Sequence, residues 1–311
     1  MKSKLLKKST LCFFYLLFVA GILTLAPNKL TAQTQVFANQ VTFEDNVDNA
    51  INATQENGDF ATLNSYGGVA VGIGAYSGEL ELQFPSTVPA NTTTFIKIDF
   101  DNDVLNSLLG GSLGDLLADV LGNVILGDHY FDVEARFFDG STSNTVFNST
   151  SRIPPSDTRY RIVKDAEGNF FIAITPDQAY NRIYIEDNTD ALLIGLFNSM
   201  NVYNVSYYTD NECAITPLFT DFDGQGLTVD LLGIGKAGVT NPEFVIDENP
   251  DNFSEISLGA INIIASIRQN VYFPNTYQPD EEFSVTLKTD PTLVTLGLLN
   301  NVQVIAYNDG S

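Results

Sequence analysis

The sequence predicts an all-β chain built from repeated β-sandwich units, with a short helical insertion in the first unit. Three observations support this prediction: apolar and polar residues alternate along most of the chain, turn-forming clusters occur at short intervals, and a set of motifs occurs twice. Apolar side chains at every second position indicate strands with one buried face. Many short strands separated by turns are typical of β-sandwiches.

The alternation is clearest in five segments, each of which we expect to form a strand. They are residues 79–84, 95–100, 131–136, 160–164 and 182–186. Clusters rich in Pro, Gly, Asp, Asn and Ser separate them and predict turns. Residues 105–126 differ, because leucines recur there at helical spacing with glycines between them. This segment therefore predicts one or two short amphipathic helices that cap the sandwich.

The N-terminus has the pattern of a secretory signal peptide over residues 1–32. Four lysines within the first eight residues precede an apolar run from Leu11 to Leu25, and Ala32 supplies the small residue before a cleavage site. The apolar run is shorter than the roughly 20 residues that a membrane-spanning helix needs. We therefore expect secretion and no membrane span after cleavage. An uncleaved membrane anchor is the alternative.

Charge and composition exclude several classes of protein. The chain has 15 Lys+Arg, 38 Asp+Glu and a formal charge of -23. Removing residues 1–32 takes five basic residues and no acid, which leaves 15 − 5 = 10 basic residues and a charge of −28. Because this negative net charge repels phosphate backbones, we expect no nucleic-acid partner. One His and two Cys are too few for zinc enzymes or iron–sulfur proteins, and Cys213 would be the only cysteine after cleavage.

Four motifs recur in the same order, which indicates an internal duplication. The pairs are 47–49 with 239–241, 56–64 with 248–257, Phe84-Pro85 with Phe273-Pro274, and 137–141 with 307–311. We expect a first sandwich over residues 33–208, a linker over 209–226, and a second, truncated sandwich over 227–311. The second unit has no counterpart of residues 142–208, so we expect unpaired strand edges and a piece of a longer repeat protein. A smaller, self-sufficient second domain is the alternative.

The start of the second unit resembles a known family. Residues 241–254 begin with Asn-Pro and continue with spaced Asp and Asn residues and an aromatic, and they look like the opening of galactose-binding-like (discoidin-type) sandwiches. This resemblance implies jelly-roll units. It also implies a structural calcium in many such loops, with Asp247, Asn249 and Asp251 as candidate ligands. The first unit has Ala50 in place of the proline, which weakens the case for calcium there.

A second resemblance covers the chain after residue 32. Residues 180–185, 201–208 and 221–233 are similar to repeat units of large secreted surface proteins of flavobacteria-like (Bacteroidota) bacteria, many of which are taken to be adhesins. It implies display on the bacterial cell surface, a role in adhesion or as a spacer, and a glycan or protein ligand.

Two catalytic motifs match only as letter patterns. Residues 110–114 match G-x-S-x-G, but that site needs a strand before it and a late His, and the only His is His129. Residues 233–238 match G-x-G-x-x-G, but Asn241-Pro242 follows instead of the helix that a dinucleotide site needs. Paired carboxylates for glycoside hydrolysis would need a cleft that the sequence does not establish. We therefore expect a non-catalytic protein.

Acidic clusters and tyrosines are the remaining candidate binding residues. Asp99, Asp101 and Asp103 alternate at the end of a strand, so they share one face and could bind calcium through their oxygens. A solvated strand end is the alternative. Sugar binding needs exposed rings beside polar side chains, and the available tyrosines are Tyr66, Tyr76, Tyr180, Tyr203, Tyr207, Tyr208 and Tyr277. Tyrosine also packs in ordinary sheets, so the sequence singles out none of them.

These observations predict a secreted, non-catalytic surface repeat protein with an adhesion or spacer role. A carbohydrate-binding module of a larger secreted protein is the alternative, and a polysaccharide hydrolase is the third hypothesis.

Overall fold

The structure of the protein is a computed structural model. It describes residues 34–69, 73–100, 105, 109, 129–149, 159–189, 197–209, 216–226, 237–258, 264–274, 277, 282–288 and 302–307. Regular structure in these residues is almost entirely antiparallel β, which confirms the predicted all-β sandwich class. The predicted signal peptide, Asp101, Asp103, Cys213 and the G-x-S-x-G segment lie outside the described residues. Of the predicted helical insertion, only Leu105 and Leu109 are described; both are helical and buried, and the rest stays a prediction.

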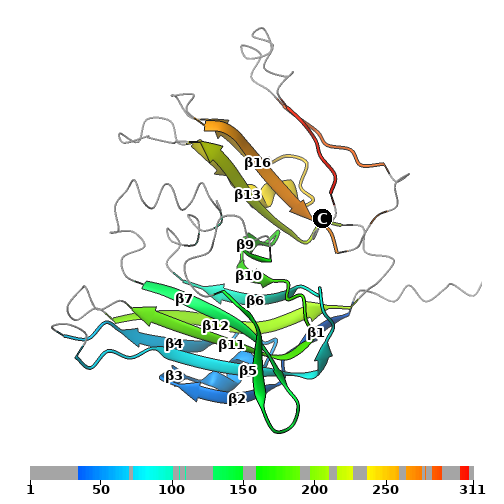
Figure 1. The fold of residues 1–311 in the computed structure, drawn as a ribbon. Coiled ribbons are helices and arrows are strands. Elements are labelled where there is room, and N and C mark those ends of the chain that lie inside the picture. Colours follow the sequence, from blue (N-terminus) through cyan, green and yellow to red (C-terminus); the bar gives the residue numbers. More distant parts are fainter. Residues whose placement is uncertain are drawn as a thin grey trace, which may run out of the picture.

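Two sheets form the sandwich (Figure 1). Within the described residues, the larger sheet has nine strands in the order β16-β13-β9-β10-β6-β12-β4-β3, with β1 paired to β12. These strands are β1 (Gln35–Phe37), β3 (Val47–Asp48), β4 (Ala61–Tyr66), β6 (Thr94–Asp99), β9 (Tyr160–Lys164), β10 (Phe170–Ile174), β12 (Phe197–Tyr208), β13 (Phe219–Gly226) and β16 (Ile264–Tyr272).

The smaller sheet has five strands in the order β2-β5-β11-β7-β8. They are β2 (Gln40–Asp45), β5 (Gly78–Val88), β7 (His129–Phe138), β8 (Ser143–Asn148) and β11 (Tyr180–Thr189). A separate pair consists of β14 (Ala237–Thr240) and β15 (Glu255–Leu258), and two short 3-10 helices are η1 (Ala50–Ala53) and η2 (Pro242–Val245). No helix in the described part of the chain is long and apolar enough to cross a membrane.

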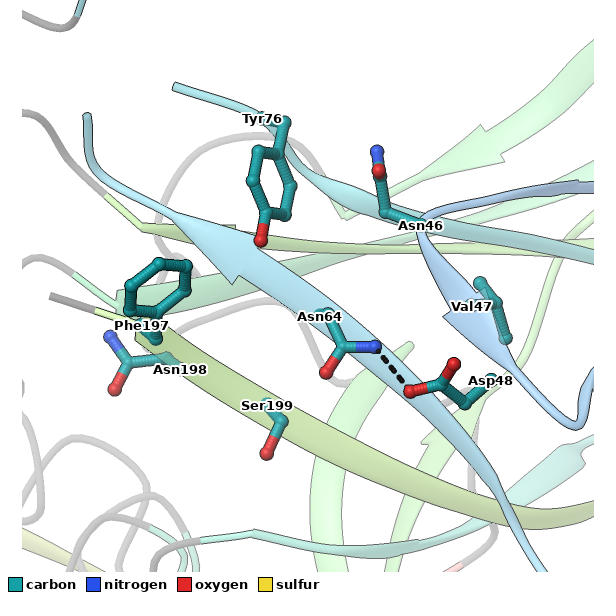
Figure 2. Close-up of a pocket in the computed structure, with 8 residues that line it drawn as sticks. All are labelled: Asn46, Val47, Asp48, Asn64, Tyr76, Phe197, Asn198 and Ser199. Carbon is teal, nitrogen blue, oxygen red and sulfur yellow. Dashed lines mark hydrogen bonds between the residues drawn. The ribbon is translucent and has the colours of Figure 1, made fainter. Parts of the chain in front are cut away.

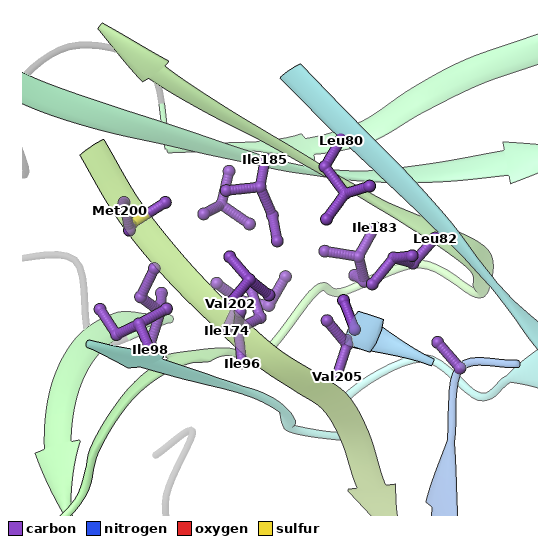
Figure 3. Close-up of a cluster of buried hydrophobic side chains, with 14 of the residues drawn as sticks. Leu80, Leu82, Ile96, Ile98, Ile174, Ile183, Ile185, Met200, Val202 and Val205 are labelled. Carbon is purple, nitrogen blue, oxygen red and sulfur yellow. The ribbon is translucent and has the colours of Figure 1, made fainter. Parts of the chain in front are cut away.

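The core lies between the two sheets, where the alternating pattern places the apolar side chains. Figure 3 shows the central group, which comprises Leu80, Leu82, Ile183 and Ile185 from the smaller sheet and Ile96, Ile98, Ile174, Met200, Val202 and Val205 from the larger one. Each such side chain contributes about 1.5–3 kcal/mol when fully buried. Because neighbouring residues on a strand point to opposite faces, this register also directs the polar residues of β5 outward.

A buried carboxylate connects the strands on the outer face of the smaller sheet. Glu81 of β5 is only 4% exposed. It accepts hydrogen bonds from Arg136 Nη1 at 2.9 Å, from Arg182 Nη1 at 3.0 Å and from Thr42 Oγ1 at 2.6 Å. Both guanidinium groups also lie over aromatic rings, with Cζ 3.8 Å from the ring centroid. The network joins four of the five strands of this sheet, namely β2, β5, β7 and β11.

The segment expected to be a linker contains a strand. Residues 219–226 form β13, which pairs with β16 along its length and meets β9 at Thr220. Phe219 stacks on Phe95 at 4.3 Å between ring centroids, and Phe222 is 9% exposed at the edge of the main core. We expected these residues to lie in a linker between two sandwiches, but the rings of Phe219 and Phe222 need cover, and the pairing of β13 provides it.

The first recurring motif has the same local structure in both of its copies. Asn49 and Asn241 both adopt the left-handed backbone conformation, with φ of 56° and 49°, and each precedes a 3-10 helix. Asn tolerates this conformation better than most residues. In each copy the strand before the helix pairs antiparallel with the strand after it, β3 with β4 and β14 with β15.

Candidate functional site

A polar depression with aromatic walls lies on the larger sheet, at the end formed by β3, β4 and β12 (Figure 2). Its volume is about 450 Å³, and it is lined by Asn46, Val47, Asp48, Asn64, Tyr76, Phe197, Asn198 and Ser199. These residues come from two distant parts of the chain, residues 46–76 and residues 197–199. The antiparallel pairing of β12 with β4 brings them together, since it places Phe197 opposite Tyr66 and Ser199 opposite Asn64.

Two exposed rings form the apolar part of this pocket. Phe197 is 69% exposed and Tyr76 is 37% exposed. One face of Phe197 stacks on Tyr66, with 4.3 Å between ring centroids and 19° between ring planes, and Tyr66 also contacts Tyr76 at 5.8 Å. Reciprocal backbone hydrogen bonds between Tyr66 and Tyr76, of 2.9 and 3.0 Å, fix the spacing of these two residues. The rings are therefore held in place while Phe197 stays open to solvent.

Amide and carboxylate groups form the polar part. Figure 2 shows Asn64 between Phe197 and Asp48, and Asn64 Nδ2 donates to Asp48 Oδ2 at 3.0 Å. Asn46 has a left-handed backbone with φ of 52°, accepts from the Asn64 amide at 3.0 Å, and donates through Nδ2 to the Ser77 carbonyl at 2.8 Å. The pocket thus presents hydrogen-bonding groups whose positions are set by the surrounding backbone.

A buried polar chain supports the pocket from below. Asn198 Nδ2 donates to Thr189 Oγ1 at 3.1 Å, and Thr189 Oγ1 lies 2.8 Å from Ser65 Oγ. Ser65 in turn donates to Asp187 Oδ2 at 2.9 Å, and both Ser65 and Asp187 are 0% exposed. Because buried polar groups are costly unless hydrogen-bonded, this series of hydrogen bonds fixes the position of Asn198 relative to both sheets.

A close approach of the two sheets also positions Asn64. Gly78, the first residue of β5, lies so near β4 that a Cβ atom would be 2.5 Å from the Asn64 nitrogen and 2.8 Å from the Leu63 carbonyl carbon. Only glycine fits there without movement of the backbone. The contact holds the strand that carries Asn64 against the start of β5.

The predicted calcium ligands lie in two separate places. Asp99 is exposed at the end of β6, opposite Asn201 of β12. Burial raises the pKa of Tyr203, and the charge of Asp99 raises it further, which places this carboxylate near the Tyr203 ring. The described part of the chain contains no group of three or more His, Cys, Asp or Glu residues that could hold a metal.

The Asp247–Asp251 loop makes its hydrogen bonds internally. Asp247 Oδ1 accepts from the Asn249 amide at 3.0 Å, and Asn249 Oδ1 accepts from the Asp251 amide at 3.1 Å. Asn252 Nδ2 donates to Asp247 Oδ2 at 2.6 Å, while Asn252 Oδ1 is buried with no hydrogen-bond partner. The loop therefore gathers oxygen atoms, one of which lacks a donor, and its chemistry fits a hard cation better than the surroundings of Asp99 do.

The structure separates the tyrosines that the sequence could not rank. Tyr76 lines the pocket and Tyr66 supports it by stacking on Phe197, whereas Tyr180 and Tyr207 are buried in the core. The others pack against neighbouring rings: Tyr203 on Phe60, Tyr208 on Phe95, and Tyr277 on Phe273. Sequence reasoning missed Phe197 and Asn64. The recurring motifs 47–49 and 56–64, which contain Asp48 and Asn64, were the local indications of this place.

Comparison with known proteins gives no relative for this chain. No protein-family model matches it, and no curated protein or solved structure shows significant similarity to it.

Proposed function

We propose that this chain is a non-catalytic, secreted surface protein that binds a neutral glycan in the pocket formed by β3, β4 and β12. The observation that carries the proposal is the combination of an exposed, buttressed ring with fixed amide and carboxylate groups in one depression of about 450 Å³. Ligand sites commonly have volumes of ~300–1,000 Å³ and combine apolar walls with a few positioned polar groups.

The chemistry of the pocket suits a sugar ring. The apolar face of a pyranose can stack on the open side of Phe197, while its hydroxyl groups exchange hydrogen bonds with Asn64, Asp48 and Ser199, which face the same side of the sheet. Because Tyr66 already stacks on the other side of Phe197, the ring loses little freedom when a ligand binds. The formal charge of the chain, -23, opposes acidic polysaccharides and favours uncharged ones.

The same pocket gives little support to hydrolysis. Glycoside hydrolases generally use two carboxyl groups on opposite sides of the scissile bond. Among the described residues that line the pocket, Asp48 is the single acid. Asp48 is also exposed and hydrogen-bonded to Asn64, which suits the recognition of a hydroxyl group better than proton transfer to a leaving group.

Export and surface display belong to the proposal through the sequence. The signal-peptide pattern at residues 1–32 supports secretion, and the likeness to bacterial surface repeats supports adhesion as the context of binding. The shared conformation of the motifs at Asn49 and Asn241 supports a chain assembled from repeated units. A spacer without a ligand remains the second candidate, since sandwich repeats serve equally well to separate binding domains.

A structural calcium in the loop from Asp247 to Asp251 is a further part of the proposal. Asp247, Asn249 and Asp251 would supply oxygen ligands there, and the ion would hold the loop in one conformation. The unpartnered Asn252 Oδ1 supports this assignment.

A glycan array tests the binding proposal. We expect the purified chain to bind a set of neutral oligosaccharides and to ignore sulfated and uronic-acid glycans. Phe197→Ala should lower the affinity ~10-fold or more, because it removes the stacking surface. Phe43→Ala is the matched control, since Phe43 is 46% exposed on β2 and does not line the pocket. Absence of binding across the array would support the spacer instead, and equal binding by Phe197→Ala would contradict this pocket as the glycan site.

A further inference from the structure

Residues 282–288 present an apolar face that no described strand covers. This segment, Glu-Phe-Ser-Val-Thr-Leu-Lys, belongs to no sheet, although its residues alternate as in a strand (Figure 1). Phe283 is 50% exposed, Val285 53% and Leu287 57%. Within the described part of the chain, no backbone hydrogen bond joins this segment to another. An exposed apolar segment with free backbone groups is a template for strand pairing.

The first unit shows how a segment of this kind is normally covered. Counting from the recurring Phe84-Pro85 and Phe273-Pro274, Val285 and Leu287 stand where the first unit has Ile96 and Ile98. Those two isoleucines are 0% and 3% exposed, because β6 is paired on both sides, with β10 and with β12. In the first unit, the strand at this position is therefore buried by pairing along both of its edges.

The segment is complementary to itself when it is reversed. In an antiparallel pair with its dyad at Val285, Glu282 of one chain stands opposite Lys288 of the other, and Phe283 stands opposite Leu287. Ser284 then stands opposite Thr286. Each acidic residue thus faces a basic one, each apolar residue faces an apolar one, and each hydroxyl group faces a hydroxyl group. Such cross-strand pairs are the stabilising unit of an antiparallel sheet. All seven residues from 282 to 288 are exposed, and none of them has a backbone partner among the described residues.

Contacts already present hold the segment in place for this pairing. The centroid of the Phe283 ring lies 5.2 Å from that of Phe273 and 4.9 Å from that of Tyr277. These ring contacts anchor the N-terminal end of the segment. At the other end, Lys288 Nζ lies 5.6 Å from the Phe253 ring centroid and stays exposed. The anchoring lowers the entropy lost when a second strand docks.

We propose that residues 282–288 form an interaction surface for a second copy of this chain, through antiparallel pairing about a two-fold axis at Val285. The complementary charges at the two ends of the segment favour this occupant over an unrelated apolar strand, and an isologous contact of this type closes as a dimer. One strand pair buries much less than the ~1,600 Å² of a standard interface, so the dimer is weak and concentration-dependent.

Cysteine cross-linking tests the position of the dyad. In a Cys213→Ser background, Val285→Cys should form a covalent dimer on mild oxidation, because facing Cα atoms lie about 4.5–5.5 Å apart, within reach of a disulfide. Leu287→Cys is the matched control, since its exposure is similar but its two copies would be about 13 Å apart. A mixture of Phe283→Cys and Leu287→Cys should cross-link again. Equal cross-linking of Val285→Cys and Leu287→Cys, or none of Val285→Cys, overturns the proposal.

Charge reversal tests the register independently. Sedimentation equilibrium should show that Glu282→Lys and Lys288→Glu each raise the dimer Kd ~10-fold or more, because each creates two like-charged pairs by symmetry. The double variant restores both pairs in reversed sense and should return close to the original Kd. A chain that stays monomeric up to its solubility limit, or a double variant no better than the single ones, contradicts a second copy as the occupant and leaves the segment to a different partner.

Discussion

Replacing Gly78 with alanine should destabilise the sandwich by about 2 kcal/mol. The new Cβ atom would lie 2.5 Å from the Asn64 nitrogen and 2.9 Å from the Asn64 oxygen, whereas ordinary contacts begin near 3.4 Å. All the atoms it meets belong to the backbone of β4, so no side-chain rotation relieves the clash and the two sheets must separate locally. Overpacking costs about 1–3 kcal/mol, and a 2.5 Å approach to backbone atoms belongs at the upper end of that range. The lower chain entropy of alanine in the unfolded state offsets about 0.4–1 kcal/mol, which leaves about 2 kcal/mol.

Urea unfolding followed by circular dichroism measures this loss as a lower midpoint at unchanged slope. Gly58→Ala is the control, because Gly58 has nothing within 4 Å of its virtual Cβ but a φ of +82°. The Gly58→Ala variant measures the cost of placing alanine in a left-handed backbone conformation without a steric clash. Gly78 does not have that conformation, so its variant measures the clash. A Gly78→Ala protein as stable as the wild type would refute the close approach of β4 and β5, and with it the positioning of Asn64 in the pocket.

Three further predictions concern charged groups. Glu81→Ala should lower stability by about 3 kcal/mol in urea unfolding, because it removes the carboxylate that two partly buried guanidinium groups share and leaves Arg136 with Glu134 and Arg182 with the uncharged Gln83. A loss under about 1 kcal/mol would show that solvent replaces the carboxylate. Burial raises the pKa of the Asp132 carboxyl above its ordinary value of 3.8, and the charges of Glu186 and Glu134 raise it further. The folded state therefore loses stability as the pH rises from 3.8 through the higher pKa of the folded state. Asp132→Asn should therefore be more stable than wild type at pH 7 by about 0.5 kcal/mol, and this gain should vanish below pH 3.8; an equal or lower stability at pH 7 would contradict it. Calcium should raise the melting temperature and a chelator should lower it, with no response in Asp247→Ala; a wild-type melting temperature that ignores both would remove the calcium assignment.

The strands of the core could be predicted because their pattern is local. Residues 79–84 and 182–186 alternate, and the structure has β5 and β11 there with the apolar residues facing inward. β13 could not be predicted in the same way, since its aromatic residues are covered by contacts with distant residues such as Phe95. An Asp-Phe-Asp-Gly sequence favours a turn unless tertiary packing overrides it.

The pocket was beyond the reach of local patterns for a similar reason. Asn64 and Phe197 are separated by more than a hundred residues and meet only because β4 pairs with β12 in one register. A shift of that register by one residue would turn Phe197 to the other face of the sheet. The residues of β4 and β12, taken separately, predict neither that the two strands pair nor in which register.

Calorimetric titration with the best neutral glycan from the array tests the proposed function most directly. We predict saturable binding with one site per chain, an affinity ~10-fold or more lower for Phe197→Ala, and an unchanged affinity for Phe43→Ala. A titration without heat of binding, or one in which Phe197→Ala and Phe43→Ala behave alike, would contradict glycan recognition by the pocket at β3, β4 and β12.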